Sequence, residues 1–351
     1  MTRAAEVTRM SDVQPEATNW TWINRIPAGE LTLLAGREGG GKSTLAYDLA
    51  AQLSLGILEG DFKDKPAGTI VVATEDDLRR TIVPRLMAAE ADLERIVQVR
   101  VNDQDEGIKD EVSLPIDLEL LADVIEAEDV RLMILDPLLS RLDVGLDTHK
   151  DSDVRRALEP LVDMAQSCEC SVLGIIHVNK HSGTDALSRV MGSRAFTAVS
   201  RSVLYVIEDP DDEKVRIIGR PKSNIGGDAP SQSFTIVSEV VGYDDAKQKE
   251  ITTGRIEWGE HNDESINGIL KRSESKGEHG PKPEAREAAQ NWLFDHLTDR
   301  PCMSAVYLAD AKADGISEST LKRAAKAIGV VVTGKGKLTS WQQPKLPVPV
   351  T

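Results

Sequence analysis

The sequence contains few aromatic residues and few cysteines. Aromatic side chains make up 4% of the 351 residues, so any core must be mostly aliphatic. The three cysteines, Cys168, Cys170 and Cys302, exclude a disulfide framework, and one C-x-C pair does not complete a zinc site. No apolar run approaches the roughly 20 residues of a membrane span, and the N-terminus lacks the apolar core of a signal peptide. We therefore expect a cytoplasmic protein with no membrane segment.

An excess of positive charge is also missing. The formal net charge of −16 excludes a uniformly basic coat of the kind that covers many nucleic-acid-binding proteins. The charge is uneven, however, because residues 276–351 carry 11 Lys and Arg against 8 Asp and Glu, a net of +3. A local basic site in this last part of the chain remains compatible with the composition.

The order of apolar segments predicts an α/β domain over residues 19–270, after a flexible N-terminus at 1–18. Five short apolar runs, each expected to be a strand, alternate with stretches of helical periodicity, which indicates a mostly parallel sheet flanked by helices. These runs are residues 31–35, 69–73, 96–101, 130–135 and 171–176. Later strands at 202–207, 214–219 and 233–237 follow one another without helices and predict an antiparallel extension.

A polar segment with several Gly and Pro residues, 271–284, reads as a linker to a second, smaller domain at 285–345. Three helices are expected there, and Val330–Val332 face Leu338 and Trp341 across a Gly/Lys turn. Three helices and a hairpin in about 65 residues are typical of a winged helix.

Residues 36–43 read Gly-Arg-Glu-Gly-Gly-Gly-Lys-Ser, a complete phosphate-loop motif between an apolar strand and a helix. Glycine allows positive φ angles and brings bare backbone N–H groups close to phosphate oxygens, and the helix N-terminus adds positive potential. The motif predicts ATP and Mg²⁺ as ligands. The predicted nucleotide-binding residues are Gly36, Gly39, Gly40, Gly41, Lys42, Ser43 and Thr44, with Lys42 on the β- and γ-phosphates and Ser43 on Mg²⁺.

Two carboxylates follow buried strands downstream of this motif. Asp136 ends the apolar run 131–135 and is a candidate second Mg²⁺ ligand, although an aspartate at a turn or helix N-cap fits the same pattern. Glu75 follows the strand at 69–73 and is a candidate base for an attacking water. Asp76 and Asp77 come directly after it, so a plain acidic loop is the alternative.

Several further polar residues are weaker candidates. His177 follows the strand after Asp136 and can sense the γ-phosphate, or be merely structural. The four cations Arg194, Arg201, Arg220 and Lys222 either include one that stabilises a phosphoryl group across a subunit interface or are solvated charges. In the C-terminal domain the basic residues Lys322, Arg323, Lys326, Lys335 and Lys337 fit phosphate contacts to DNA, with a protein-binding domain as the alternative.

Taken in order, these motifs resemble the RecA-like ATPases of the RepA hexameric replicative helicase type, an AAA family of phages and plasmids. The resemblance covers roughly residues 20–240 and includes the less specific elements Leu135–Leu138, His177-x-x-Lys180 and Gly192–Phe196 with Arg201. It implies a ring of six subunits, with ATP between subunits and single-stranded DNA in the channel. By motif position it assigns catalysis to Lys42, Glu75, Asp136 and His177, and interface contacts to Arg220 and Lys222.

Two positions depart from that family's pattern. Ile176 stands where related proteins often have the first of two histidines, and Asn224 stands where the usual Lys-x-Arg pair would place arginine after Lys222. The leading hypothesis is a DNA-dependent motor, either a RepA/DnaB-like helicase or a helicase loader. An ATP-switched DNA-binding regulator is the alternative, favoured slightly by Asn224, and a filament-forming recombinase ranks third.

Overall fold

A computed structural model describes residues 7–102, 109–178, 185–226, 229–277, 283–297, 302–333 and 339–342. The chain divides into two compact units, Met1–Arg272 and Ser273–Thr351. No helix in the described part of the chain is long and apolar enough to cross a membrane.

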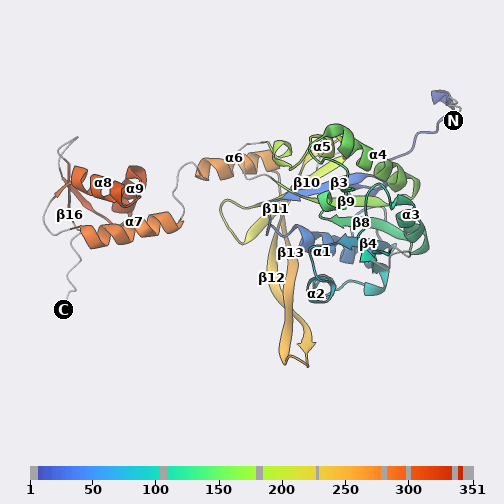
Figure 1. The fold of residues 1–351 in the computed structure, drawn as a ribbon, viewed down its shortest axis with the longest axis horizontal. Coiled ribbons are helices and arrows are strands. Elements are labelled where there is room, and N and C mark those ends of the chain that lie inside the picture. The colour runs from blue at the N-terminus through green and yellow to red at the C-terminus, as the bar shows by residue number, and fades with distance from the viewer. Residues whose placement is uncertain are drawn as a thin grey trace. The chain divides into compact units, whose positions relative to one another are not determined.

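The first unit is built on a nine-stranded mixed sheet (Figure 1). Its order is β13-β12-β11-β10-β3-β9-β8-β4-β5. The six parallel strands are β10 (Ser202–Glu208), β3 (Leu31–Gly36), β9 (Ser171–His177), β8 (Val130–Asp136), β4 (Gly68–Ala73) and β5 (Ile96–Gln98). The three antiparallel strands are β11 (Val215–Ser223), β12 (Ser231–Asp244) and β13 (Lys249–Asn262). Two small hairpins complete the unit: β1 (Trp20–Trp22) with β2 (Ile26–Pro27), and β6 (Val101–Asn102) with β7 (Lys109–Asp110).

Helices cover both faces of the sheet. Side chains of α1 (Lys42–Ser54) and α2 (Val83–Ala88) join one hydrophobic cluster, and those of α3 (Leu118–Ala127), α4 (Asp151–Ser167) and α5 (Ala195–Val199) join the other. Figure 1 shows the two helix groups on opposite sides of the strands. Along β8, Leu132 and Ile134 enter the first cluster while Met133 and Leu135 enter the second. Strands buried on both faces read as continuous apolar runs, so the predicted α/β phosphate-loop core is confirmed.

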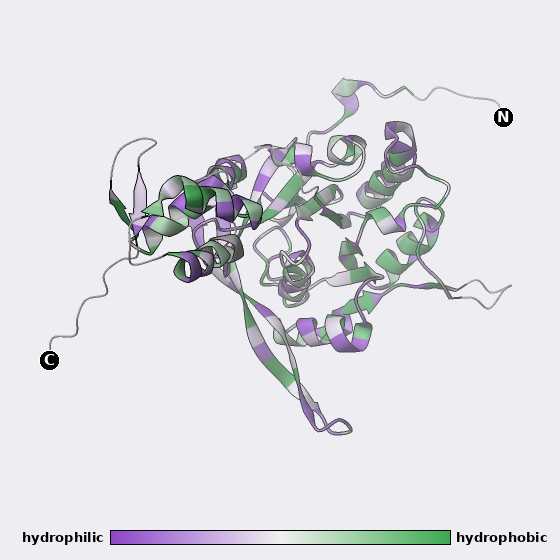
Figure 2. Ribbon diagram, turned by 60° about the vertical axis from the view of Figure 1, so that its left-hand side comes forward, coloured by the Kyte–Doolittle hydropathy of each residue, from purple (hydrophilic) through white to green (hydrophobic). Residues whose placement is uncertain are grey.

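Strands β12 and β13 have 14 residues each and form a long antiparallel pair, here called the ribbon. Its far end extends well beyond the rest of the sheet (Figure 1), and polar residues dominate there (Figure 2). The predicted antiparallel extension is therefore present, but the sequence-based expectation stopped at residue 237 and missed β13. The segment Lys249–Asn262 is rich in Thr, Gly and Glu and lacks a clear apolar alternation, because only its base packs on a hydrophobic core.

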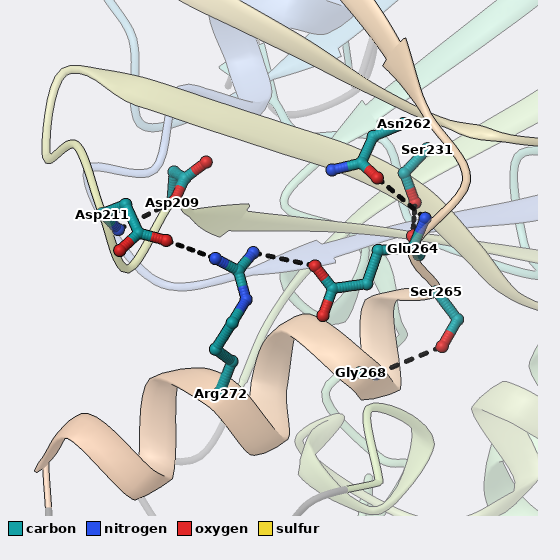
Figure 3. Close-up of polar contacts among 8 residues, drawn as sticks. All are labelled: Asp209, Asp211, Ser231, Asn262, Glu264, Ser265, Gly268 and Arg272. Atoms are coloured by element: carbon teal, nitrogen blue, oxygen red, sulfur yellow. Dashed lines mark hydrogen bonds and ion pairs between the residues drawn. The ribbon is translucent and has the colours of Figure 1, made fainter.

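Helix α6 (Ile266–Gly277) begins just after β13 and includes residues 271–277, which were expected to belong to a linker. Ile266, Ile269 and Leu270 are buried in the core of the first unit. Figure 3 shows Arg272 of α6 in ion pairs with Glu264 and with Asp211, which lies between β10 and β11. Apolar burial at its start and the two ion pairs of Arg272 explain why this polar sequence is helical.

The second unit contains α7 (Pro283–His296), α8 (Ser304–Ala313) and α9 (Glu318–Ala327). The hydroxyl of Ser317 caps α9 by accepting from the Thr320 N–H. A small antiparallel sheet has the order β14 (Cys302–Met303), β16 (Ser340–Gln342), β15 (Val331–Thr333). The core of the second unit contains aliphatic and aromatic side chains of all three helices and of β16, among them Leu293, Tyr307, Leu321 and Trp341.

Candidate functional site

The phosphate-loop segment joins the buried strand β3 to helix α1. Gly39 and Gly41 have φ angles of 71° and 86°, which L side chains rarely adopt, and Gly41 directly precedes the first residue of α1. The Gly41 carbonyl accepts the Leu45 N–H at 2.9 Å, so the helix is formed from its first turn. The loop therefore directs backbone N–H groups outward at a helix N-terminus, the arrangement that binds phosphate.

Lys42 is buried within this loop, with 5% of its surface exposed. Its Nζ donates to the carbonyls of Gly36 at 3.1 Å and Arg37 at 2.8 Å, and lies 3.4 Å from Nδ1 of His177. Burial lowers the pKa of the ammonium, while the carboxylates of Asp136, Glu38 and Glu75 act in the opposite direction. An anionic phosphate beside this desolvated ammonium would favour its charged form, so the loop fits a polyphosphate.

Asp136 occupies the last position of β8 and is 8% exposed. Its carboxylate accepts a hydrogen bond from the Ser43 hydroxyl. Burial raises the pKa of Asp136, the Ser43 hydrogen bond lowers it, Asp76 and Glu75 raise it, and Lys42 lowers it. Asp136 is not the N-cap of the short helical turn that follows, where Leu138 holds that place. The Ser43–Asp136 pair is a fitting oxygen donor set for Mg²⁺.

The three consecutive acids after β4 have different surroundings. Asp76 pairs with Arg85 of α2 at 2.6 Å, and Asp77 caps the helical turn Leu78–Ile82 by accepting two backbone N–H groups. Glu75 is exposed, and it makes no hydrogen bond or ion pair to the rest of the described chain. Of the three carboxylates, Glu75 is thus the one whose oxygens are available to a water molecule.

Strand register explains why these residues meet. In the parallel sheet Ala73 pairs with Asp136, and Gly36 pairs with His177. The carboxyl ends of β3, β4, β8 and β9 therefore lie at one edge, where ligands bind in open α/β sheets. A cavity of about 340 Å³ opens there. Its lining includes the predicted residues Gly39, Gly41, Lys42, Ser43, Thr44, Glu75, Asp136 and His177.

The cavity also contains residues that the motifs did not identify. Glu38, Asp76, Arg85, Ile175 and Ile236 complete its lining. Asp76 and Arg85 form an ion pair between the loop after β4 and helix α2. No local sequence pattern predicts this pair, although Asp76 directly follows the predicted Glu75. Ile236 lies in β12, about 195 residues after the loop, and only the pairing of the late strands brings it here.

Arg220 and Lys222 lie at the other edge of the sheet. Through β10, Lys222 of the antiparallel β11 lies level with Leu33 in the middle of β3, and the side chains of Arg220 and Lys222 reach loops at the amino ends of the strands rather than the phosphate loop. Arg220 donates to the Asn24 carbonyl, and Lys222 Nζ donates to the carbonyls of Thr197 and, at 2.9 Å, Ser200. Burial and then the nearby Arg201 lower the pKa of Lys222. Neither side chain lines the cavity of its own chain.

The remaining candidates are placed as follows. Arg201 pairs with Glu30 at 3.6 Å, and Arg194 is exposed just before α5. Lys322 of α9 pairs with Glu318 at 2.5 Å. Asn179, Lys180, Lys335 and Lys337 lie outside the described residues, as does the side chain of Arg323. A larger cavity of about 430 Å³ lies near Glu30 and Ile225, at the edge away from the phosphate loop, and none of the motifs falls in it.

Comparison with known proteins gives a family match and similar solved structures. A family model described as an AAA domain matches residues 2–183, just over half of the chain, and this span includes the phosphate loop, Glu75, Asp136 and His177. A crystal structure of the RadB recombinase aligns with a TM-score of 0.42 and 14% identity, over 60% of this chain and 89% of that one. None of the curated proteins matches the sequence.

Proposed function

Since this chain belongs to the AAA domain family, we propose that it is an ATP-hydrolysing, DNA-dependent motor of the RecA-like RepA/DnaB type, working as a replicative helicase or as its loader. The observation that carries the proposal is the convergence of Lys42, the Ser43–Asp136 pair, Glu75 and His177 on one cavity. These are the groups that phosphoryl transfer to water requires: a phosphate-binding cation, a metal-binding pair and a carboxylate near the position of the nucleophile.

Each side chain has a distinct part in this chemistry. Lys42, held by two loop carbonyls, would exchange them for phosphate oxygens. Ser43 and Asp136 would hold Mg²⁺, which when bound neutralises charge on the phosphates. Glu75 would orient a water molecule and accept its proton. His177, within 3.4 Å of the Lys42 ammonium, would report changes at the γ-phosphate to the segment after β9.

We further propose that the cation completing the site comes from a neighbouring subunit of a hexameric ring. Arg220 and Lys222 lie at the opposite sheet edge from the cavity of their own chain, which supports a role in trans rather than in cis. A cation supplied in this way stabilises the charge that develops during transfer.

Single-stranded DNA would run through the channel of this ring, gripped by the segments 179–192 and 219–227. We interpret the second unit as a winged helix that contacts duplex DNA or a partner. Two features support this interpretation. The elements follow in the order helix, strand, two helices and two strands, and α9 carries the basic residues Lys322 and Lys326.

The experiment that tests the motor is ATP turnover with and without single-stranded DNA. The wild-type protein should be stimulated by DNA. Lys42→Ala should abolish nucleotide binding, with Lys63→Ala, an exposed lysine paired to Glu59, as its matched control. Turnover that does not respond to single-stranded DNA would refute a motor.

Glu75→Gln separates binding from chemistry in the same assay. It should lower turnover at least 100-fold while ATP affinity stays within about twofold, since the carboxamide keeps the shape but cannot accept a proton. Glu119→Gln, an exposed residue in the first turn of α3, is the control. Normal hydrolysis by Glu75→Gln would show that another group is the base.

The alternative is an ATP-switched DNA-binding regulator without unwinding activity. Asn224 favours it, because asparagine cannot supply the charge that the third position of a Lys-x-Arg pair supplies. Site-specific duplex binding that depends on ATP, together with no strand separation, would establish this alternative over the motor.

A further inference from the structure

The base of the ribbon presents one row of side chains to helix α1. Arg216 of β11 pairs with Phe234 of β12, which pairs with Trp258 of β13. Directly paired residues in antiparallel strands share a face, and alternation along β12 places Ile236 on the same face as Phe234. Phe234 is 1% exposed and packs with α1 side chains in the same hydrophobic cluster. The row thus covers α1, and Ile236 and Arg216 lie toward the phosphate loop.

Ile236 reaches the nucleotide cavity directly. A Cβ atom at Gly41 would lie only 2.5 Å from Cδ1 of Ile236, so this methyl group rests on the loop backbone. Most of the cavity lining is charged or polar, and Ile175, the other aliphatic side chain in it, is 1% exposed. Ile236 is only half-buried and therefore offers apolar surface that phosphates and Mg²⁺ cannot use.

Arg216 stands beside Ile236 on the same loop. Its Cδ and Nε atoms lie 3.6 and 3.7 Å from the Cβ position of Gly41. Nη1 donates to the Lys214 carbonyl at 3.1 Å, whereas Nε is buried and has no hydrogen-bond partner in the described part of the chain. A guanidinium on an otherwise apolar face is costly unless it contacts a ligand, and its planar surface suits stacking on an aromatic ring.

Ile236 and Arg216 form a surface beside the phosphate loop, here called the wall. The strand next to it, β13, is connected to α1 through Trp258. Nε1 of Trp258 donates to Oδ2 of Asp48 at 2.9 Å, and Trp258 also packs edge-on against Trp22 at a centroid distance of 5.8 Å. Asp48 belongs to the helix that begins at the phosphate loop. The ribbon and the loop are thereby held in one arrangement, which reduces the cost of ordering the wall when a ligand binds.

We infer that Ile236 and Arg216 form the nucleoside subsite of the ATP site, an inference that rests on the proposed function. Ile236 contacts the ribose and the base through its methyl groups, and the Arg216 guanidinium stacks on the base. The subsite thus adds affinity for a nucleoside triphosphate over a bare polyphosphate. It relies on shape and stacking rather than on hydrogen bonds to base edges.

The test compares two ligands that differ only in the nucleoside. Isothermal titration in Mg²⁺ buffer would measure the affinity for ATP and for inorganic tripolyphosphate in wild type, Ile236→Ala and Arg216→Lys, which keeps the positive charge but lacks the planar guanidinium. Both variants should bind ATP about tenfold more weakly and tripolyphosphate within twofold of wild type, since only apolar contact or stacking is lost. Retained tripolyphosphate binding also shows that the loop is folded. Val240→Ala, an exposed aliphatic residue further along β12, is the matched control.

Four results would overturn the inference. Equal weakening for both ligands would place the side chains at the phosphates or in loop folding. Unchanged ATP affinity in both variants would remove them from the site. Wild-type protein that binds tripolyphosphate as tightly as ATP would leave no nucleoside subsite to assign. Wild-type protein that binds neither ligand would refute the proposed ATPase itself, and the subsite with it.

Discussion

Charged side chains have different surroundings at the two ends of the parallel strands, here called the carboxyl edge and the amino edge of the central sheet. At the carboxyl edge, one cavity is lined by Lys42, Asp136 and Glu75. The carboxylates act to raise the pKa of Lys42, and Lys42 acts to lower the pKa of Asp136. At the amino edge, Arg220 and Lys222 donate to backbone carbonyls of the loops beside them, and the neighbouring cations Arg25 and Arg201 lie close by.

This difference separates a cluster that is open to a ligand from one that is bound within the chain. At the carboxyl edge, Lys42 can exchange two loop carbonyls for a ligand, because it lines a cavity at a helix N-terminus. At the amino edge, burial and then Arg220 bring the pKa of Arg25 to about 10, and burial and then Arg201 lower the pKa of Lys222. An anion from a neighbouring subunit would offset the repulsion between these cations, which is the basis of the role in trans that we propose for them.

The prediction with the largest expected effect tests whether a cation at the amino edge of one subunit completes the ATP site of its neighbour. Arg220→Ala should lower DNA-stimulated ATP turnover about 1,000-fold, as for other fingers supplied in trans, with ATP affinity within twofold. Mixing Arg220→Ala with Lys42→Ala should restore part of the turnover, because some interfaces would join an intact loop to an intact finger. Arg155→Ala, an exposed α4 residue, is the control. Mixtures as inactive as the separate variants would count against a role in trans.

A second change tests the metal pair at the carboxyl edge. Asp136→Asn keeps an oxygen that can accept from Ser43 but removes the charge that favours Mg²⁺. Turnover at fixed Mg²⁺ should fall about 10- to 100-fold, and the Mg²⁺ concentration for half-maximal rate should rise. Asp123→Asn, on an exposed position of α3, controls for loss of a carboxylate elsewhere. An unaltered Mg²⁺ titration would exclude Asp136 as a metal-binding group.

A third change tests the anchor behind the carboxyl-edge wall. Trp258→Phe removes the Nε1–H that donates to Asp48, a carboxylate that is 8% exposed. The free energy of unfolding should fall by about 0.5–1.5 kcal/mol, because the buried carboxylate loses one of its two hydrogen-bond donors and keeps Gln52. Denaturant unfolding measures the change, with Trp292→Phe in the second unit as a comparison. Equal stability of wild type and Trp258→Phe would mean that packing alone holds the ribbon.

The smallest effect is a pH dependence at the same anchor. Burial raises the pKa of Asp48 above its ordinary value of 3.8, although hydrogen bonds from Trp258 and Gln52 oppose the shift. The folded state then binds more protons than the unfolded state between 3.8 and the folded pKa, so stability falls as pH rises through that window. Asp48→Asn should lack this fall, and its advantage over wild type should grow with pH until Asp48 is fully ionised. Unfolding curves measured at a series of pH values would reveal it, and parallel pH profiles would contradict it.

Much of the core was predictable because its signals are local. A strand, a glycine loop and a helix N-terminus occupy fewer than 30 consecutive residues, and their chemistry follows from neighbours in the chain. The alternation of strands and helices predicted the α/β class for the same reason. Glu75, Asp136 and His177 could be proposed because each directly follows a recognisable buried strand, and the carboxyl ends of parallel strands share one edge.

Other elements could not be read from local patterns. Strand β13 has the composition of a polar loop, and its partner β12 supplies what its own sequence lacks. The first half of α6 is helical because Ile269 and Leu270 find a core, which no linker-like composition reveals. Strand β14 has two residues, too few to form a pattern.

The sequence alone determined that a phosphate-binding loop opens an α/β sheet and that two carboxylates and a histidine end strands beside it. Those features depend on backbone geometry and burial within short segments. Only the tertiary structure decided that Ile236 and Arg216 rest on Gly41 and that Trp258 holds Asp48, because the register of late antiparallel strands sets these contacts. It also placed Arg220 and Lys222 at the far edge, since the direction of β11 reverses that of β3.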